Sequence, residues 1–303
     1  MMHLADMLQE AELSELALSR EMSLGRSRLL AGANAGQVLS GDLGELSAAT
    51  ATGLAAPFHA LNYVAHESWA WANYKATILA FAAQSVAHAQ GRPVRVLEIG
   101  GGRDPLFTAV EVMHAKLSFT VNDIDAAELE LAPNWCHKAH FDIAGDLGAA
   151  HASLGHYDLI VSQMVFEHIH DVRQAWANCH ALLAPGGVAL AFFPTLFAPP
   201  YVLNYLMPEF LSAAILRWFF PTRHQGVQPK FPAYYDHCRG SQAKLAPLFE
   251  KIGFSSSLVV PFWSHGYFRK LPGLREIDAF VQNLARKRDW RAITTYAYAV
   301  ACK

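Results

Sequence analysis

The chain has 303 residues, of which 52% are hydrophobic and 17% are charged. This composition excludes a disordered chain and predicts a folded protein with one large domain and a sizeable core. The net charge of −2 hides an asymmetry, because residues 1–214 carry 10 basic and 21 acidic side chains whereas residues 215–303 carry 14 and 5. A basic C-terminal part favours an anionic partner such as phosphate, a lipid head group or nucleic acid, with a plain solvated surface as the alternative.

Cysteine usage and the N-terminal residues bear on the compartment. The four cysteines lie far apart and form no Cys-x-x-Cys pair, so neither a disulfide framework nor a zinc knuckle is indicated. The first residues include Asp6 and Glu10 instead of a basic stretch, which argues against a signal peptide. No run reaches the roughly 18 apolar residues of a membrane-spanning helix. These features predict a cytoplasmic protein.

The N-terminal part differs in composition from the rest. Residues 2–30 are rich in helix formers and predict one or two surface helices, and residues 31–57 are rich in small residues and predict a linker. We therefore predict an N-terminal helical extension and linker over 1–57 and one larger domain over 58–303. A long helix or a helix pair is expected within 59–89.

From Pro93 onward, short apolar runs alternate with helical stretches. This alternation predicts an α/β fold with a parallel sheet. Asp104 followed by Pro105 is typical of an N-cap and a first helical residue, which predicts a helix starting at Pro105. Strands are expected at 94–99, 116–122, 157–163, 187–193, 256–262 and 294–302, and helices near 105–115, 171–183 and 241–252.

A glycine turn ends the first of these strands. Glu98 precedes Gly100, Gly101 and Gly102. Glycines allow the backbone to approach a ligand closely, and the following helix offers free N–H groups. Asp123 ends the second strand, 21 residues after Gly102, where an acid can accept hydrogen bonds from the ribose hydroxyls of an adenosine. Nicotinamide-dependent and S-adenosylmethionine-dependent enzymes share this arrangement.

Three features separate those two classes. Pro105 stands where the dinucleotide fingerprint requires glycine or alanine. Glu98 can bind the α-amino group of a methionine moiety but would repel a pyrophosphate. The runs YDLIVS (157–162), FEH (166–168) and LAPGG (183–187) have no counterpart in the dehydrogenase pattern.

The runs VLEIGGG, VNDID, FD, YDLIVSQMVFEHIHD and LLAPGGVALAFF resemble, in order and spacing, the class I S-adenosylmethionine-dependent methyltransferases, especially the broad group in which the fourth strand leads into Glu-His. The resemblance covers residues 92–194. It implies a Rossmann-like, doubly wound and mostly parallel seven-stranded sheet with an antiparallel last strand. It also implies S-adenosylmethionine as the cofactor, and it says little about the methyl acceptor.

The resemblance implies a role for each matching residue. Two departures from the pattern stand out, because Asp104 replaces the usual third glycine and the segment between the second and third strands is short. The residues implied for the cofactor are Glu98, Gly100, Gly101, Gly102 and Gln163 at the methionine end, Asp123 at the ribose, and Ile124, Asp142 and Ile143 at the adenine.

Two residues just past the fourth strand are candidates for proton transfer. Methyl transfer is a single displacement, so the protein mainly aligns donor and acceptor. A base is needed only when the acceptor starts protonated, and His168, next to Glu167, has a suitable side chain for that role. The alternative is that this pair braces the loop. No metal site is predicted, because His168 and His170 have no third ligand beside them.

Residues 195–240 predict a lid inserted after the fifth strand. Within it, residues 208–220 predict an apolar helix about 20 Å long, too short to span a bilayer. This helix either covers the active site or lies on an anionic membrane surface, and the flanking basic residues suit either a lipid or a phosphate on the acceptor. Tyr234, Tyr235 and His237 are candidates for the acceptor pocket, with simple packing as the alternative.

We therefore predict S-adenosylmethionine-dependent methyl transfer to an oxygen or nitrogen of a small acceptor. The acceptor is expected to be apolar or phosphate-bearing, such as a natural product, a lipid or a lipid-linked sugar. Two alternatives stay open: an NAD(P)-dependent reductase, and a non-catalytic binding protein that keeps the fold. No nucleic-acid partner is expected, since no Asn/Asp-Pro-Pro-aromatic motif follows the fourth strand. The sequence does not indicate an oligomeric state.

Overall fold

The computed structural model describes residues 53–148, 154–197, 232–266, 268 and 272–303. The helices expected within 2–30, most of the linker, and the helix at 208–220 with its predicted membrane contact lie outside the described residues. The strands are β1 (Val94–Ile99), β2 (Leu117–Asp123), β3 (His137–His140), β4 (Tyr157–Gln163), β5 (Leu183–Pro194), β6 (Ser256–Phe262) and β7 (Tyr296–Cys302). The helices are α3 (Ala56–Ala60), α4 (Glu67–Gln84), α5 (Val86–Ala89), α6 (Ala109–His114), α7 (Ala126–Leu131), α9 (Val172–Leu182), α12 (Gln242–Ile252) and α13 (Leu274–Lys287), with short 3₁₀ turns η2 (Phe166–His168) and η4 (Arg291–Ile293).

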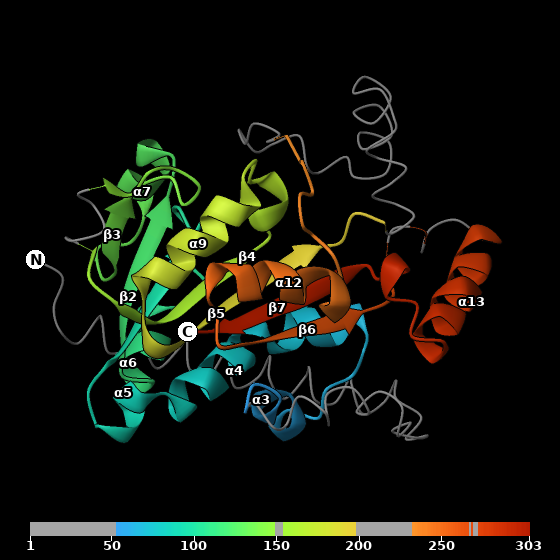
Figure 1. Cartoon of the computed structure of the whole chain (residues 1–303), viewed down its shortest axis with the longest axis horizontal. Coiled ribbons are helices and arrows are strands. Elements are labelled where there is room, and N and C mark those ends of the chain that lie inside the picture. The colour runs from blue at the N-terminus through green and yellow to red at the C-terminus, as the bar shows by residue number, and fades with distance from the viewer. Residues whose placement is uncertain (1–52, 149–153, 198–231, 267, 269–271) are drawn as a thin grey trace, which may run out of the picture. The chain divides into compact units, whose positions relative to one another are not determined.

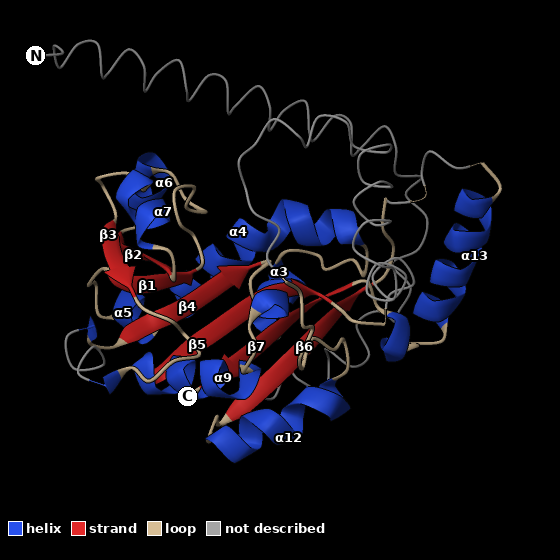
Figure 2. Ribbon diagram, turned by 90° about the horizontal axis from the view of Figure 1, so that it is seen from above, coloured by secondary structure: helices blue, strands red, loops and turns tan. Residues whose placement is uncertain are grey.

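The seven strands form one sheet in the order β3-β2-β1-β4-β5-β7-β6 (Figure 1). Strands β1 to β5 pair in parallel, and β7 pairs antiparallel with both β5 and β6. Figure 2 shows α4 on one face of this sheet and α9 and α12 on the other. The expected Rossmann-like fold with an antiparallel last strand is confirmed.

The central strands are buried because helices cover both faces of the sheet. All residues of β4 except its last are buried, as are all residues of β1 except its second. This explains why both read as nearly continuous apolar runs instead of an alternating pattern. Both strands end at the same edge of the sheet, β1 before the glycine turn and β4 at Gln163.

Helix α4 is fastened to the sheet by one buried tyrosine. The hydroxyl of Tyr74 donates to the carbonyl of Ser162 in β4 at 2.5 Å and to that of Leu190 in β5 at 3.0 Å. Its ring packs against Phe192 and Tyr298, with centroid distances of 5.4 and 5.2 Å. One side chain therefore joins the helix to three strands.

The helix after the glycine turn starts later than expected, so the prediction of an N-cap at Asp104 is wrong. Helix α6 begins at Ala109, and Thr108 is its N-cap. The Thr108 hydroxyl accepts from Glu111 N, and the Glu111 carboxylate accepts from Thr108 N, which forms a capping box. Before this point, Leu106 N donates to the buried carboxyl group of Glu98 at 2.9 Å.

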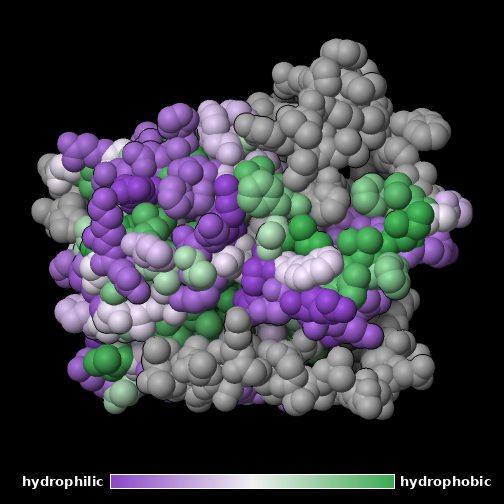
Figure 3. All heavy atoms as spheres, turned by 45° about the vertical axis from the view of Figure 1, so that its right-hand side comes forward, coloured by the Kyte–Doolittle hydropathy of each residue, from purple (hydrophilic) through white to green (hydrophobic). Residues whose placement is uncertain are grey.

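Helix α13 exposes apolar side chains. Leu274, Ile277 and Phe280 are 42%, 64% and 69% exposed, and Arg286 and Lys287 lie in the last turn. In Figure 3, hydrophobic side chains gather on the side of the molecule where α13 lies. Among the described helices, none is long and apolar enough to cross a membrane.

All four cysteines of the sequence are free thiols. Cys136, Cys179 and Cys238 are buried and Cys302 is half-buried. Burial raises the pKa of the Cys179 thiol to about 12 and raises that of Cys238 well above its usual value. The buried thiols therefore behave as small apolar side chains.

Replacing Tyr74 by phenylalanine is expected to lower the free energy of unfolding by about 1–3 kcal/mol, because the carbonyls of two buried strands lose their hydroxyl partner. Urea unfolding monitored by circular dichroism measures this change. Tyr234→Phe is the matched control, since its side chain is 44% exposed, and it should change stability by less than about 0.5 kcal/mol. Equal effects of the two substitutions would contradict the anchoring role.

Candidate active site

The carboxyl ends of β1, β2 and β4 meet where the strand order reverses. Ile99, the last residue of β1, aligns with the penultimate residues of β2 and β4. Gly100, Asp123 and Gln163 therefore lie level with one another at the sheet edge. Such a reversal is where open α/β sheets bind their ligands.

The glycine turn packs directly on two carboxyl groups. A Cβ atom at Gly101 would lie 2.6 Å from Val121 Cγ2 and 2.7 Å from the carboxyl carbon of Glu98. A Cβ atom at Gly102 would lie 2.9 Å from Asp123 Oδ2. A side chain larger than hydrogen therefore does not fit in this turn, and the structure brings the predicted turn, Glu98 and Asp123 together.

Glu98 is a buried acid, with 4% of its surface exposed. Its carboxyl group accepts a hydrogen bond from Leu106 N at 2.9 Å. Burial raises the pKa of Glu98 to about 8, although this hydrogen bond and the charge of Lys75 act in the opposite direction. The group is therefore mostly protonated at neutral pH, and a cation placed beside it would draw it into the ionised form.

Helix α7, which follows β2, is tied to the glycine turn by an ion pair that the sequence analysis missed. Arg103, just after the turn, contacts the carboxylate of Glu128 on α7 through Nε and Nη2. Asp123 Oδ1 accepts from Asp125 N at 2.9 Å, which shapes the start of α7. Ile124, between these two acids, is 61% exposed, so its side chain is available to a flat ring at the sheet edge.

The two residues predicted near the adenine differ in exposure. Asp142 is exposed, and its Oδ1 accepts from Ala144 N at 2.8 Å. The side chain of Ile143 is buried in the core, and its carbonyl accepts from Asn178 Nδ2 at 2.7 Å. The structure therefore places Asp142 on the accessible surface and the Ile143 side chain inside the core.

The chain turns sharply after β4 and returns to the glycine turn. Gln163 is half-buried, and Met164 has a φ of +56°. A Cβ atom at Gly100 would lie 2.6 Å from Val165 Cγ2, so Val165 covers this glycine. Val165 is a second neighbour of the turn that the sequence analysis missed.

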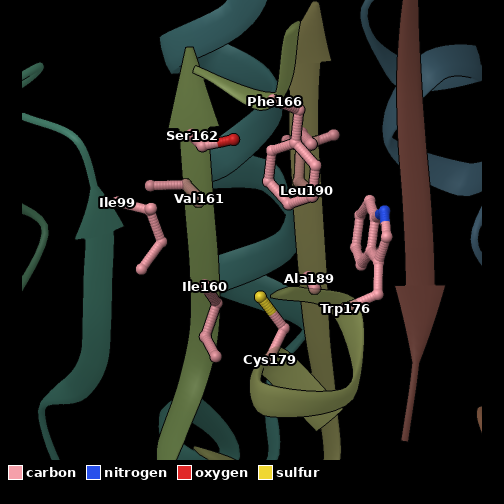
Figure 4. A pocket seen from close by; sticks show the side chains of 10 residues that line it. Ile99, Ile160, Val161, Ser162, Phe166, Trp176, Cys179, Ala189 and Leu190 are labelled. Carbon is pink, nitrogen blue, oxygen red and sulfur yellow. The ribbon is translucent and has the colours of Figure 1, made fainter. Parts of the chain in front are cut away.

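The 3₁₀ turn η2 is anchored by its first residue. Phe166 is buried, and its ring centroid lies 4.7 Å from that of Trp176 on α9. Figure 4 shows Phe166 and Trp176 beside β5, among core side chains that leave no space for a ligand between them. This packing holds Glu167 and His168 at the sheet edge.

Glu167 and His168 form a second acid site. Glu167 Oε1 lies 3.8 Å from His168 Nε2, and Glu167 Oε2 is buried and has no hydrogen-bond partner among the described residues. Burial raises the pKa of Glu167 to about 8. His168 Nδ1 lies 2.9 Å from the carbonyl of Pro232. A neutral imidazole donates to this carbonyl through Nδ1 and keeps a lone pair on Nε2, which can accept a proton.

The three candidates for the acceptor pocket have different surroundings. The backbone N–H groups of Tyr234 and Tyr235 donate to the carbonyl of Glu167 at 2.8 and 3.1 Å. Tyr234 is 44% exposed, whereas Tyr235 is buried in the core. His237 Nδ1 pairs with Asp236 Oδ1 at 2.7 Å. Of the three, Tyr234 combines an exposed ring with a position beside Glu167.

No group of three or more histidine, cysteine, aspartate or glutamate side chains in the described part of the chain has a geometry that could hold a metal ion.

A family model described as a methyltransferase domain matches residues 68–255. The chain belongs to this family. The family and fold expected from the sequence motifs, those of the S-adenosylmethionine-dependent methyltransferases, are thereby confirmed. The family match gives no support to the alternative of an NAD(P)-dependent reductase.

Curated relatives are distant. A ubiquinone biosynthesis O-methyltransferase of a Caulobacter species is 28% identical over 141 residues, which is 45% of this chain and 53% of that protein. A highly reducing polyketide synthase of Strobilurus tenacellus is 30% identical over 106 residues, which is 32% of this chain and 4% of the synthase. Among solved structures, a SAM-dependent methyltransferase from Archaeoglobus fulgidus has a TM-score of 0.44 at 15% identity, over 70% of this chain and 86% of that one.

Glu167→Gln is expected to flatten the dependence of stability on pH. Because the pKa of Glu167 is about 8 in the folded state and 4.5 as the usual value, its contribution to stability is complete below pH 4.5 and is lost as the pH rises through 8. The slope that it adds is at most about 1.4 kcal/mol per pH unit. Urea unfolding between about pH 5 and pH 8 measures the slope. Glu250→Gln, an exposed position on α12, should leave the slope unchanged, and a slope unchanged in Glu167→Gln would contradict the buried acid.

Proposed function

We propose that this protein transfers the methyl group of S-adenosylmethionine to an oxygen or nitrogen atom of a small acceptor. The observation that carries the proposal is the buried carboxyl of Glu98 beneath a glycine turn that touches Asp123, at the reversal of strand order in a methyltransferase-family fold. A pyrophosphate would gain no charge pairing at Glu98 and would keep it protonated, whereas an α-amino group would draw it into the ionised form and pair with it. S-adenosylmethionine supplies the electrophilic methyl group on its sulfonium.

The residues of the sheet edge divide between the two ends of this cofactor. Glu98 and Gln163 would hold the methionine end, and the backbone of Gly100–Gly102 would run beside it. Asp123 would accept hydrogen bonds from the ribose hydroxyls, which matches its place at the end of β2. Ile124 and Asp142, both exposed, would contact the adenine.

A hydroxyl oxygen is the acceptor atom that the pair of Glu167 and His168 suits best. His168 Nε2 would take the acceptor's proton as the oxygen–methyl bond forms and the sulfonium–methyl bond breaks, which leaves S-adenosylhomocysteine. The bond from His168 Nδ1 to the carbonyl of Pro232 then stabilises the imidazolium, as does Glu167 when ionised. The similarity to the Caulobacter ubiquinone biosynthesis O-methyltransferase supports an oxygen acceptor.

Binding of S-adenosylmethionine at pH 7 is expected to release close to one proton. Glu98 is mostly protonated in the free protein because its pKa is about 8, and pairing with the α-amino group lowers that pKa. Calorimetry in buffers of different ionisation enthalpy measures the release. Glu98→Gln should abolish it and weaken binding by about tenfold or more, whereas Asp123→Asn should weaken binding and keep the release. Binding of wild-type protein without proton release would contradict the role of Glu98.

His168→Ala is expected to lower turnover by a factor of about 10² or more, with cofactor affinity within about twofold. Turnover is measured as S-adenosylhomocysteine formed together with a methylated product, found by mass spectrometry in cell extract supplied with labelled cofactor. His88→Ala, an exposed histidine on α5, is the control and should keep full turnover. Cofactor binding without any methylated acceptor in extract would instead favour a non-catalytic binding protein.

A further inference from the structure

A hollow at the carboxyl end of β5 has a cationic lining. It has a volume of about 140 Å³, is open to solvent, and lies at the same sheet edge as the candidate active site. Its walls include the basic side chains of Arg239, Lys244 and Arg291, together with Phe197 and Cys238, and none of the described residues that line it is acidic. A hollow of this volume is smaller than the pocket of a whole drug-sized ligand and suits a small charged group.

Arg239 is held in place by neutral groups. Its guanidinium lies 4.6 Å from the ring centroid of Phe197, and its Nη1 donates to the carbonyl of Cys238 at 3.3 Å. No carboxylate among the described residues pairs with it. An arginine has five N–H donors, so this arrangement fixes the cation and leaves donors for a ligand.

The other two cations add to an uncompensated positive charge. Lys244 lies in the first turns of α12, is exposed, and has no ion pair within the described part of the chain. Arg291 pairs through Nε with Asp289. Among the described residues, Arg239 and Lys244 have no carboxylate partner, which leaves an excess of positive charge around the hollow.

Residues 234–240, several of which line this hollow, also contact Glu167. At one end, the N–H groups of Tyr234 and Tyr235 donate to the carbonyl of Glu167. Further along, the carbonyl of Cys238 accepts from Leu196 N at 3.1 Å, and Cys238 lines the hollow. The hollow and Glu167 are therefore joined by one short stretch of chain, residues 234–240.

We propose that this hollow binds a phosphate group on the methyl acceptor, as a phosphate ester or a diphosphate. Three cations around one cavity match the double charge and the several acceptor oxygens of such a group, and charge-assisted hydrogen bonds give it strength and direction. The proposal rests on the function proposed above and names the acceptor class for it. The basic C-terminal part of the sequence thereby has a specific place, at Arg239, Lys244 and Arg291.

Calorimetric titration of the full chain with phenyl phosphate and with phenol, at constant ionic strength, tests the proposal. Phenyl phosphate should bind at least about tenfold more tightly than phenol, because only the ester carries the charge. Arg239→Gln and Lys244→Gln should each weaken its binding by about tenfold. Lys251→Gln, on the same helix but outside the hollow, should change it by less than about twofold. Equal binding of the two compounds, or equal losses in Lys251→Gln and Arg239→Gln, would overturn the proposal.

Two further measurements separate this site from the cofactor site and distinguish the source of the phosphate. The affinity of each variant for S-adenosylmethionine should stay within about twofold of wild type. If wild-type protein bound phenyl phosphate through Arg239 but not S-adenosylmethionine, the proposed function would fail and the phosphate site would stand. Sedimentation with phosphatidic acid vesicles identifies a lipid-borne acceptor if Arg239→Gln loses binding, and a soluble acceptor if wild type and variant sediment equally.

Discussion

The reversal of strand order at β1 is the constraint on which the rest of this structure depends. Since β1 is parallel to both of its neighbours, the same pleat level brings together the ends of three strands that are far apart in sequence. The glycine turn, Asp123 and the segment that leads into η2 then share one edge without any long-range pairing of their own side chains. A slip of one residue in either pairing would turn these side chains to the opposite face, so the sheet register itself maintains the site.

Two buried glutamates at this edge share an environment and differ in their neighbours. Glu98 faces a backbone N–H group and the glycine turn, and Glu167 faces an imidazole and a segment from much later in the chain. Burial makes the ionised form of each unfavourable in the absence of a cation. Such groups lower the stability of the folded state at neutral pH. Two of them at the edge where open α/β sheets bind ligands indicate a functional site, because a bound cation would stabilise their ionised forms.

Much of the fold was predictable because its strands are apolar runs that end in glycine or an acid. Strand β3 was not among the runs identified, since Ala139 is its single buried residue and its other residues are two histidines and a lysine. The start of α6 was misplaced because Asp104-Pro105 resembles a cap, although Thr108 and Glu111 already had capping-box spacing. The contacts of residues 232–240 with Glu167 had no local signal, because they join segments about 65 residues apart and depend on tertiary packing.

The state of the cysteines decides how motions of this protein can be followed. All four native thiols are buried or half-buried, and burial raises the pKa of three of them, Cys136, Cys179 and Cys238, so a bulky maleimide dye reacts with them slowly. A single cysteine introduced at an exposed surface position would react first, without prior removal of the native ones. A fluorescence or spin label placed in this way, for instance at Ile277 on α13, which is 64% exposed, would report on that helix in an otherwise unaltered protein.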